Sequence, residues 1–132
     1  MVDKTPNAVG RVLLFSDLHI HPHKRKTERL EDCLKVLEWV FDTAIKRGIE
    51  NILFGGDLFH DGQKIDVLTY QRTFEIFDKK ISEWRKGNGE AKIWLLLGNH
   101  DLWHLKKHDV SSVDPLAAID GGVRAVVIID GR

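Results

Sequence analysis

The sequence predicts an α/β fold in which helices cover a parallel β-sheet. Short apolar runs alternate with longer segments in which apolar residues recur every three or four positions. The first pattern is typical of buried parallel strands, and the second is typical of amphipathic helices. Their alternation, with short polar loops between them, predicts right-handed strand–helix–strand units in one sheet.

The first strand is predicted at residues 11–16 and the first helix at residues 27–47. The strand segment (RVLLFS) is mainly apolar and ends at the polar Asp17. Thr27 is a suitable N-cap for the helix, and Gly48 is a suitable residue to end it. Apolar residues spaced by three and four positions place one helix face toward the sheet: Leu30, Leu34, Leu37, Phe41, Ala44 and Ile45.

The second strand is predicted at residues 51–55 and the second helix at residues 67–84, after the polar loop 57–64. Gly87 and Gly89 are expected to stop this helix. Its apolar side chains again share one face, so we expect them in the core: Val67, Tyr70, Phe74, Phe77, Ile81 and Trp84.

The last part of the chain predicts a third strand at residues 92–97, followed by a polar loop that Gly98 opens. A weaker helix near residues 113–119 leads to a fourth strand at residues 124–129. No internal repeat or linker interrupts the pattern. We therefore expect residues 1–132 to form a single domain.

The composition is that of an ordinary globular domain, with 42% hydrophobic and 30% charged residues. The net charge is zero, so the overall charge does not indicate a free-standing nucleic-acid binder. The single cysteine, Cys33, excludes an internal disulfide and is expected to be inert and partly buried. No apolar run approaches the roughly 20 residues of a membrane span. Residues 1–10 lack the apolar core of a signal peptide, so we expect a cytoplasmic protein.

Polar clusters follow three of the predicted strands, at residues 17–19, 56–57 and 98–101. Ligands of parallel sheets collect at the carboxyl ends of the strands, where these clusters lie. We therefore expect four donor side chains to converge there: Asp17, His19, Asp57 and Asn99. Carboxylate, imidazole and amide donors together suit Mn²⁺, with Fe²⁺ and Zn²⁺ as alternatives.

Two metals about 3.5–4 Å apart would favour phosphoryl transfer, because they clamp the attacking and leaving oxygens and activate a water. Asp57, in the middle cluster, is the natural bridge between them. His100 stands beside Asp101, as expected for a histidine that a carboxylate prepares to protonate a leaving group.

Each of these residues also has a simpler explanation. A single aspartate or histidine at a strand end is usually a turn former or helix cap. The glycines Gly55, Gly56 and Gly98 are explained equally by loops that need a positive φ. The repetition of compatible donors after three successive strands favours a metal site.

The motifs DLH (17–19), GGDLFH (55–60) and GNHD (98–101), in this order, resemble the first three motifs of the calcineurin-like metallophosphoesterases. Residues 55–61 look most like the SbcD-type nucleases of DNA double-strand-break repair and phage recombination, and residues 98–104 are similar to the phage members. The resemblance implies that the chain is the N-terminal half of the family's catalytic sandwich.

The resemblance also implies metal-ligand roles. Asp17 and His19 would hold the first of two divalent metals, Asp57 would bridge both, and Asn99 would bind the second.

Three further residues would take part in catalysis. His100 would contact the phosphate with support from Asp101, and His60 would lie near the scissile phosphate. An alternative for His60 is a loop histidine that stacks on Phe59.

The sequence departs from the family pattern in its histidines. The family has a later histidine and a closing Gly-His-x-His motif, whereas the last histidine here is His108. On that pattern the first metal lacks one ligand and the second lacks two. We expect a fragment, a split-gene half completed by another chain, or a remnant without catalysis, and hence a poor nuclease in isolation.

One dense basic run follows the first motif. Lys24, Arg25, Lys26 and Arg29 would grip the DNA backbone, since phosphate neutralisation supplies most nonspecific affinity. The alternative is a solvated loop. Cations at a helix N-terminus oppose the macrodipole, so helix stability does not explain them. The neighbouring His21 and His23 are not expected to be metal ligands.

The function predicted is metal-dependent hydrolysis of DNA phosphodiesters, in partnership with an SbcC-type ABC ATPase. A phosphatase, a cyclic-nucleotide phosphodiesterase and a non-catalytic assembly subunit remain alternatives. By resemblance, a homodimer or a complementing chain is also expected, with Leu68, Ile76 or Trp103 as candidate contacts. No membrane partner is expected.

Overall fold

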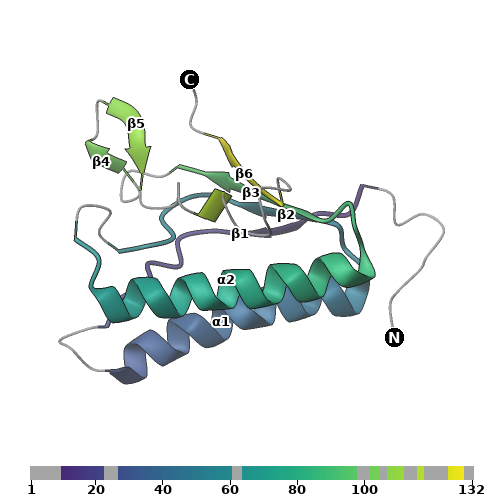
Figure 1. The fold of residues 1–132 in the computed structure, drawn as a ribbon, viewed down its shortest axis with the longest axis horizontal. Coiled ribbons are helices and arrows are strands. Elements are labelled where there is room, and N and C mark those ends of the chain that lie inside the picture. The colour runs from purple at the N-terminus through teal and green to yellow at the C-terminus, as the bar shows by residue number, and fades with distance from the viewer. Residues whose placement is uncertain are drawn as a thin grey trace.

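The computed structural model describes residues 10–22, 27–60, 64–97, 102–104, 107–111, 116–117 and 125–129. Its strands and helices confirm the predicted α/β class. A parallel sheet has the strand order β1-β2-β3-β6, with bounds Leu13–Phe15, Asn51–Phe54, Lys92–Leu96 and Val126–Ile129. The helices α1 (Thr27–Arg47) and α2 (Val67–Gly87) lie side by side along one face of this sheet (Figure 1).

The strand register places two rows of apolar residues toward the helices. One row is Leu13, Ile52, Ile93 and Val126, and the other is Phe15, Phe54, Leu95 and Ile128. Side chains between these rows point to the opposite face because successive residues of a strand alternate. On that face Leu14 is 68% exposed, and Leu53, Trp94 and Val127 are half-buried.

The predicted helix faces are confirmed with two exceptions. The predicted core residues of α1 are buried or packed on the core, as are Tyr70, Phe74, Phe77, Ile81 and Trp84 of α2. Val67, the first residue of α2, is instead 80% exposed. Ile76 is buried, which removes it from the predicted pairing surface, whereas Leu68 is exposed.

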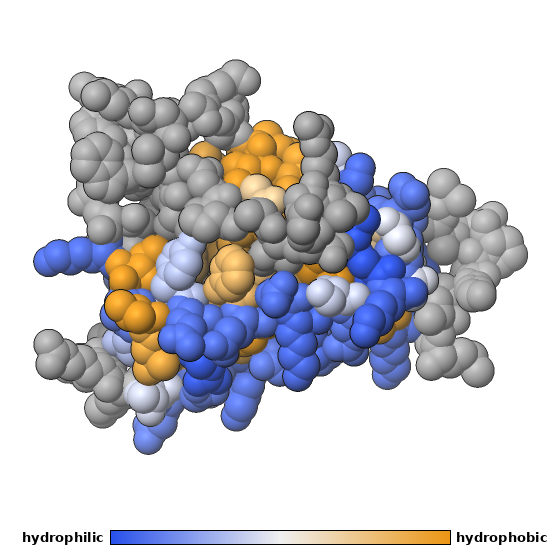
Figure 2. Space-filling view, viewed as in Figure 1, coloured by the Kyte–Doolittle hydropathy of each residue, from blue (hydrophilic) through white to orange (hydrophobic). Residues whose placement is uncertain are grey.

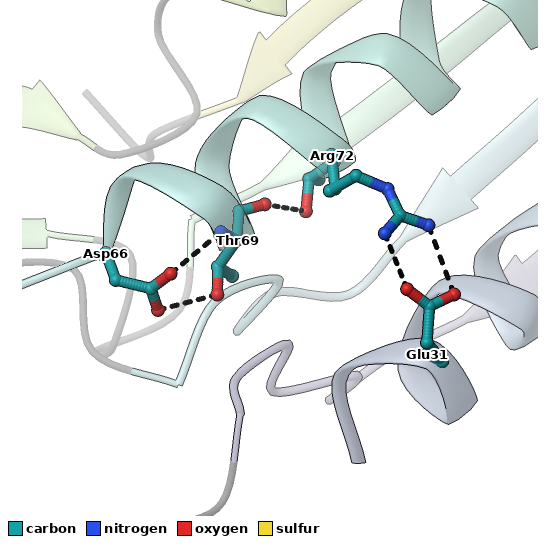
Figure 3. Close-up of polar contacts among 5 residues, drawn as sticks. Glu31, Asp66, Thr69 and Arg72 are labelled. Atoms are coloured by element: carbon teal, nitrogen blue, oxygen red, sulfur yellow. Dashed lines mark hydrogen bonds and ion pairs between the residues drawn. The ribbon is translucent and has the colours of Figure 1, made fainter. Parts of the chain in front are cut away.

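The start of α2 is fixed by a cap, and its first turns are tied to α1 (Figure 3). The Asp66 carboxylate accepts hydrogen bonds from Thr69 N at 2.9 Å and Thr69 Oγ1 at 2.6 Å. Arg72 donates to both carboxylate oxygens of Glu31 in α1, at 2.5 and 3.1 Å. At the other end of α1, Gly48 adopts a φ of 63°, which confirms its predicted role in ending the helix.

The predicted strands are longer than the observed ones, and one predicted loop is wrong. Residues after Gly98 were expected to form a polar loop, but β4 (Leu102–His104) and β5 (Lys107–Ser111) pair there as an antiparallel hairpin. An antiparallel pair does not require the continuous apolar run that marks a buried parallel strand, so the pattern gave no signal. Of the predicted helix at 113–119, only residues 116–117 are described, in a 3₁₀ turn.

The surface of the two helices is largely hydrophilic in the view of Figure 2, and apolar surface gathers over the sheet and near the start of α2. Within the described part of the chain, no helix is both long and apolar enough to cross a membrane.

Candidate metal centre

The pairing of β1 with β2 continues beyond the ends of both strands. Five backbone hydrogen bonds of 2.8–3.3 Å join the two following loops: Gly55 N to Phe15 O, Asp17 N to Gly56 O, His19 N to Asp57 O, Ile20 N to Leu58 O, and His60 N to Ile20 O. The DLH and GGDLFH motifs therefore run side by side at the carboxyl edge of the sheet.

The backbone of these loops is strained at the predicted metal ligands. Among the described residues, the non-glycine residues with positive φ are Asp17 (54°), His19 (47°) and Asp57 (58°). This left-handed conformation costs an L-residue about 1–2 kcal/mol. Strain of this kind gathers at functional sites, where the surrounding structure imposes it.

The three side chains converge. One donor atom from each of Asp17, His19 and Asp57 can be chosen so that all three lie within 4.8 Å of one another. His19 Nε2 is 3.6 Å from Asp17 Oδ1 and 4.0 Å from Asp57 Oδ2. These distances are too long for hydrogen bonds and short enough for the three atoms to contact one ion. Oxygen and imidazole donors suit the predicted divalent metals, so the residues fit such an ion.

The exposure of the three side chains to solvent decreases from Asp17 to His19 to Asp57. The Asp17 side chain is 64% exposed, His19 is 31% exposed and Asp57 is 18% exposed. Asp57 is therefore the donor that the protein encloses most.

Ser16 stabilises the charged form of Asp17. Ser16 Oγ donates a hydrogen bond of 2.5 Å to Asp17 Oδ2. This bond lowers the pKa of Asp17 from its ordinary value, and the nearby His19 lowers it further. The lowered pKa favours the charged carboxylate, which is the form that binds a metal.

Glycines 55 and 56 are required for different reasons. Gly56 adopts a φ of 112°, as the loop explanation predicted. A β-carbon at Gly55 would lie 2.8 Å from Ser16 Oγ and 3.1 Å from Ser16 Cβ. Gly55 thus allows the two loops to approach closely, and the loop explanation is wrong for this residue.

His60 lies beside the metal ligands. Its ring centroid is 5.8 Å from that of His19 in an edge-on arrangement and 4.2 Å from that of His21 in a stack. The predicted alternative of a stack on Phe59 is wrong, because Phe59 is buried and stacks on Tyr70. The sequence placed His21 in the basic run and did not predict its stack on His60, although its position two residues after His19 was an available signal.

The other predicted site residues are not brought together in the part of the chain that the structure describes. Asn99, His100 and Asp101 lie outside it, as do Lys24, Arg25 and Lys26. Arg29 is described and is exposed in the first turns of α1.

A parallel sheet with carboxylate and imidazole donors at its carboxyl edge defines an α/β protein with a candidate metal site. Residues 10–132 match the family model described as calcineurin-like phosphoesterase, and the chain belongs to this family. Membership supports metal-dependent hydrolysis of phosphoesters in general. A search of curated proteins gave no match.

Proposed function

We propose that this chain supplies the first half of a two-metal site that hydrolyses DNA phosphodiesters, as in SbcD-type nucleases. The observation that carries the proposal is the paired loop structure that gathers Asp17, His19 and Asp57. The metal proposed is Mn²⁺, with Fe²⁺ and Zn²⁺ as alternatives suited to the same donors.

Asp17 and His19 would hold the first metal, Asp57 would bridge, and Asn99 would hold the second. The bridging role agrees with the position of Asp57, whose carboxylate faces His19 across the paired loops. When bound, divalent ions would neutralise charge on the phosphate and lower the pKa of a water.

Three side chains would act on the substrate. His60 would contact the scissile phosphate, which agrees with its place beside His19. His100 would protonate the leaving oxygen, and Asp101 would hold His100 in the required tautomer.

A preference for DNA is supported by two further features. The loop sequence 55–61 resembles that of SbcD-type nucleases. A pocket of about 60 Å³ beside the paired loops is lined by His21, His60 and Lys64, which suit the phosphate of DNA or of another phosphoester, and also by Ile20, Ile65, Asp66 and Thr69. The basic residues Lys24, Arg25, Lys26 and Arg29 would extend this contact along the DNA backbone. An SbcC-type ABC ATPase is the proposed partner.

A complementing layer of protein is proposed for the open face of the sheet. Parallel sheets are normally covered on both faces, but in the part of the chain that the structure describes, both helices lie on one face (Figure 1). The other face and its β1 edge expose Val12 (50%), Leu14 (68%) and Ile129 (38%). This surface agrees with completion of the site by a second chain or a second copy.

The test compares Mn²⁺-dependent hydrolysis of linear DNA, a monoester and a cyclic nucleotide. The full chain is assayed alone and after mixing with a polypeptide that carries the later histidine motifs. We expect DNA cleavage in the mixture and little in the chain alone. Preference for the monoester or the cyclic nucleotide would assign a phosphatase or cyclic-nucleotide phosphodiesterase, and absence of metal binding would favour an assembly subunit.

The DNA contact is tested by salt dependence. Neutralising Lys24, Arg25 and Lys26 should weaken duplex binding and reduce the log–log salt slope by up to roughly 0.9 per lost contact. A matched control neutralises three exposed lysines of the helices instead: Lys46, Lys79 and Lys86. Equal slopes for the two triple variants would indicate that the basic run is a solvated loop that does not contact DNA.

A further inference from the structure

His21 and His60 form a ring pair that spans the two paired loops. Their centroids are 4.2 Å apart and their planes differ by 21°, which is a stacked arrangement. His21 follows the first ligand loop, and His60 ends the GGDLFH loop. The pair therefore adds a side-chain link to the backbone hydrogen bonds between the loops.

The His21 ring is anchored to a metal-ligand residue. Its Nδ1 lies 2.7 Å from the carbonyl oxygen of His19. A carbonyl oxygen can only accept, so Nδ1 of His21 must carry the hydrogen and donate it. This hydrogen bond sets the orientation of the ring plane that His60 stacks upon.

The stack on His21 contributes to the orientation of the His60 ring. Its side chain is exposed, and an exposed imidazole samples several rotamers. The stack on His21 selects an orientation in which the His60 ring meets that of His19 edge-on at 5.8 Å. The backbone of His60 is held as well, because its N–H donates to Ile20 O at 3.3 Å.

We propose that His21 is a positioning residue whose ring, hydrogen-bonded to the carbonyl oxygen of His19, holds His60 against the metal centre. The proposal rests on the proposed function, in which His60 contacts the phosphate. His21 itself would touch neither the metal nor the reacting atoms.

The kinetic test separates the stack from the hydrogen bond. His21→Ala removes both, whereas His21→Phe keeps a ring for stacking. We expect His21→Ala to lower kcat for DNA about tenfold, with KM changed less, in the full chain mixed with the complementing polypeptide. His21→Phe should recover most of this loss.

A double-mutant cycle tests whether His21 acts through His60. If it does, the double variant His21→Ala/His60→Ala should be no slower than His60→Ala alone. Additive losses would overturn the proposal, because they would give His21 a role independent of His60.

Two further measurements do not depend on DNA cleavage. The imidazole C–H resonances of His60 in the full chain should shift in His21→Ala and less in His21→Phe, because the stacked ring is lost only in the former. Mn²⁺ binding should be retained in both variants. Unchanged His60 resonances, or loss of Mn²⁺ in His21→Ala, would overturn the positioning role whether or not the chain cleaves DNA. Shifted resonances without any DNA cleavage by the wild type would support the positioning and overturn the nuclease function instead.

Discussion

A backbone hydrogen bond joins His19 to Asp57, and the side chains of the two residues face each other. The His19 N–H donates to the Asp57 carbonyl oxygen at 3.0 Å, and His19 Nε2 lies 4.0 Å from Asp57 Oδ2. The backbone bond belongs to the series that extends the β1–β2 pairing. The convergence of the donors is therefore a consequence of the sheet, and changes that disturb the pairing should also disturb metal binding.

Backbone strain at Asp57 predicts an unusual order of stability. Asp57 has a φ of 58°. The Asp57→Gly variant should therefore be more stable than Asp57→Ala by about 1 kcal/mol, since glycine adopts this conformation without the steric cost. Both variants lose the same carboxylate, so the comparison isolates the backbone. Urea denaturation in the presence of a chelator measures the difference.

The same pair of substitutions at Lys79 is the control. Lys79 is exposed within α2, where alanine should exceed glycine in stability by about 1 kcal/mol. If alanine were also the more stable residue at position 57, the strain assigned to this loop would be wrong.

The close approach at Gly55 predicts a cost for one added methyl group. Gly55→Ala should destabilise the fold by about 1–3 kcal/mol, because its β-carbon would lie 2.8 Å from Ser16 Oγ. Gly89→Ala should change stability little, since a β-carbon there meets nothing within 4 Å. Thermal unfolding of both variants measures the contrast.

Adding Ser16→Gly to Gly55→Ala should recover much of the lost stability, because it removes the atoms that the new methyl group meets. No recovery in the double variant would show that the cost arises elsewhere in the loop.

The link between the helices predicts a pH dependence. Two hydrogen bonds from Arg72 hold the pKa of Glu31 below its ordinary value. A lowered pKa in the folded state stabilises the fold above the unfolded pKa, and this stabilisation is lost as the pH falls through the folded pKa. The free energy of unfolding of the wild type should thus exceed that of Glu31→Gln at neutral pH, and this difference should shrink below about pH 4.3.

Denaturant titrations at several pH values measure this difference. In an Arg72→Gln background, Glu31→Gln should show a much weaker dependence on pH, because only the charge of Lys35 would still lower the pKa of Glu31. An undiminished dependence there would assign the effect to another group.

The sequence predicted the helices and the parallel sheet well because their signals are local. The spacing of Leu30, Leu34, Leu37 and Phe41 reflects burial on one helix face, and all four residues are buried. The hairpin of β4 and β5 was not predicted, because an antiparallel pair leaves no comparable apolar run.

The site was predictable in its donors but not in how they are held. Strand ends of a parallel sheet meet at one edge, so Asp17, His19 and Asp57 could be expected together. Their positive φ values and the stack of His21 on His60 depend on pairing between distant loops, which no local pattern encodes.

Asp57 is proposed to hold divalent metal at the paired loops, and the metal content of purified variants measures this role. Wild type, Asp57→Ala and His60→Ala are loaded with Mn²⁺, separated from free ion and analysed for bound metal. We predict that Asp57→Ala loses the metal, because it removes the carboxylate proposed to bridge, and that His60→Ala retains it. Equal metal content in wild type and Asp57→Ala would show that Asp57 does not hold the metal.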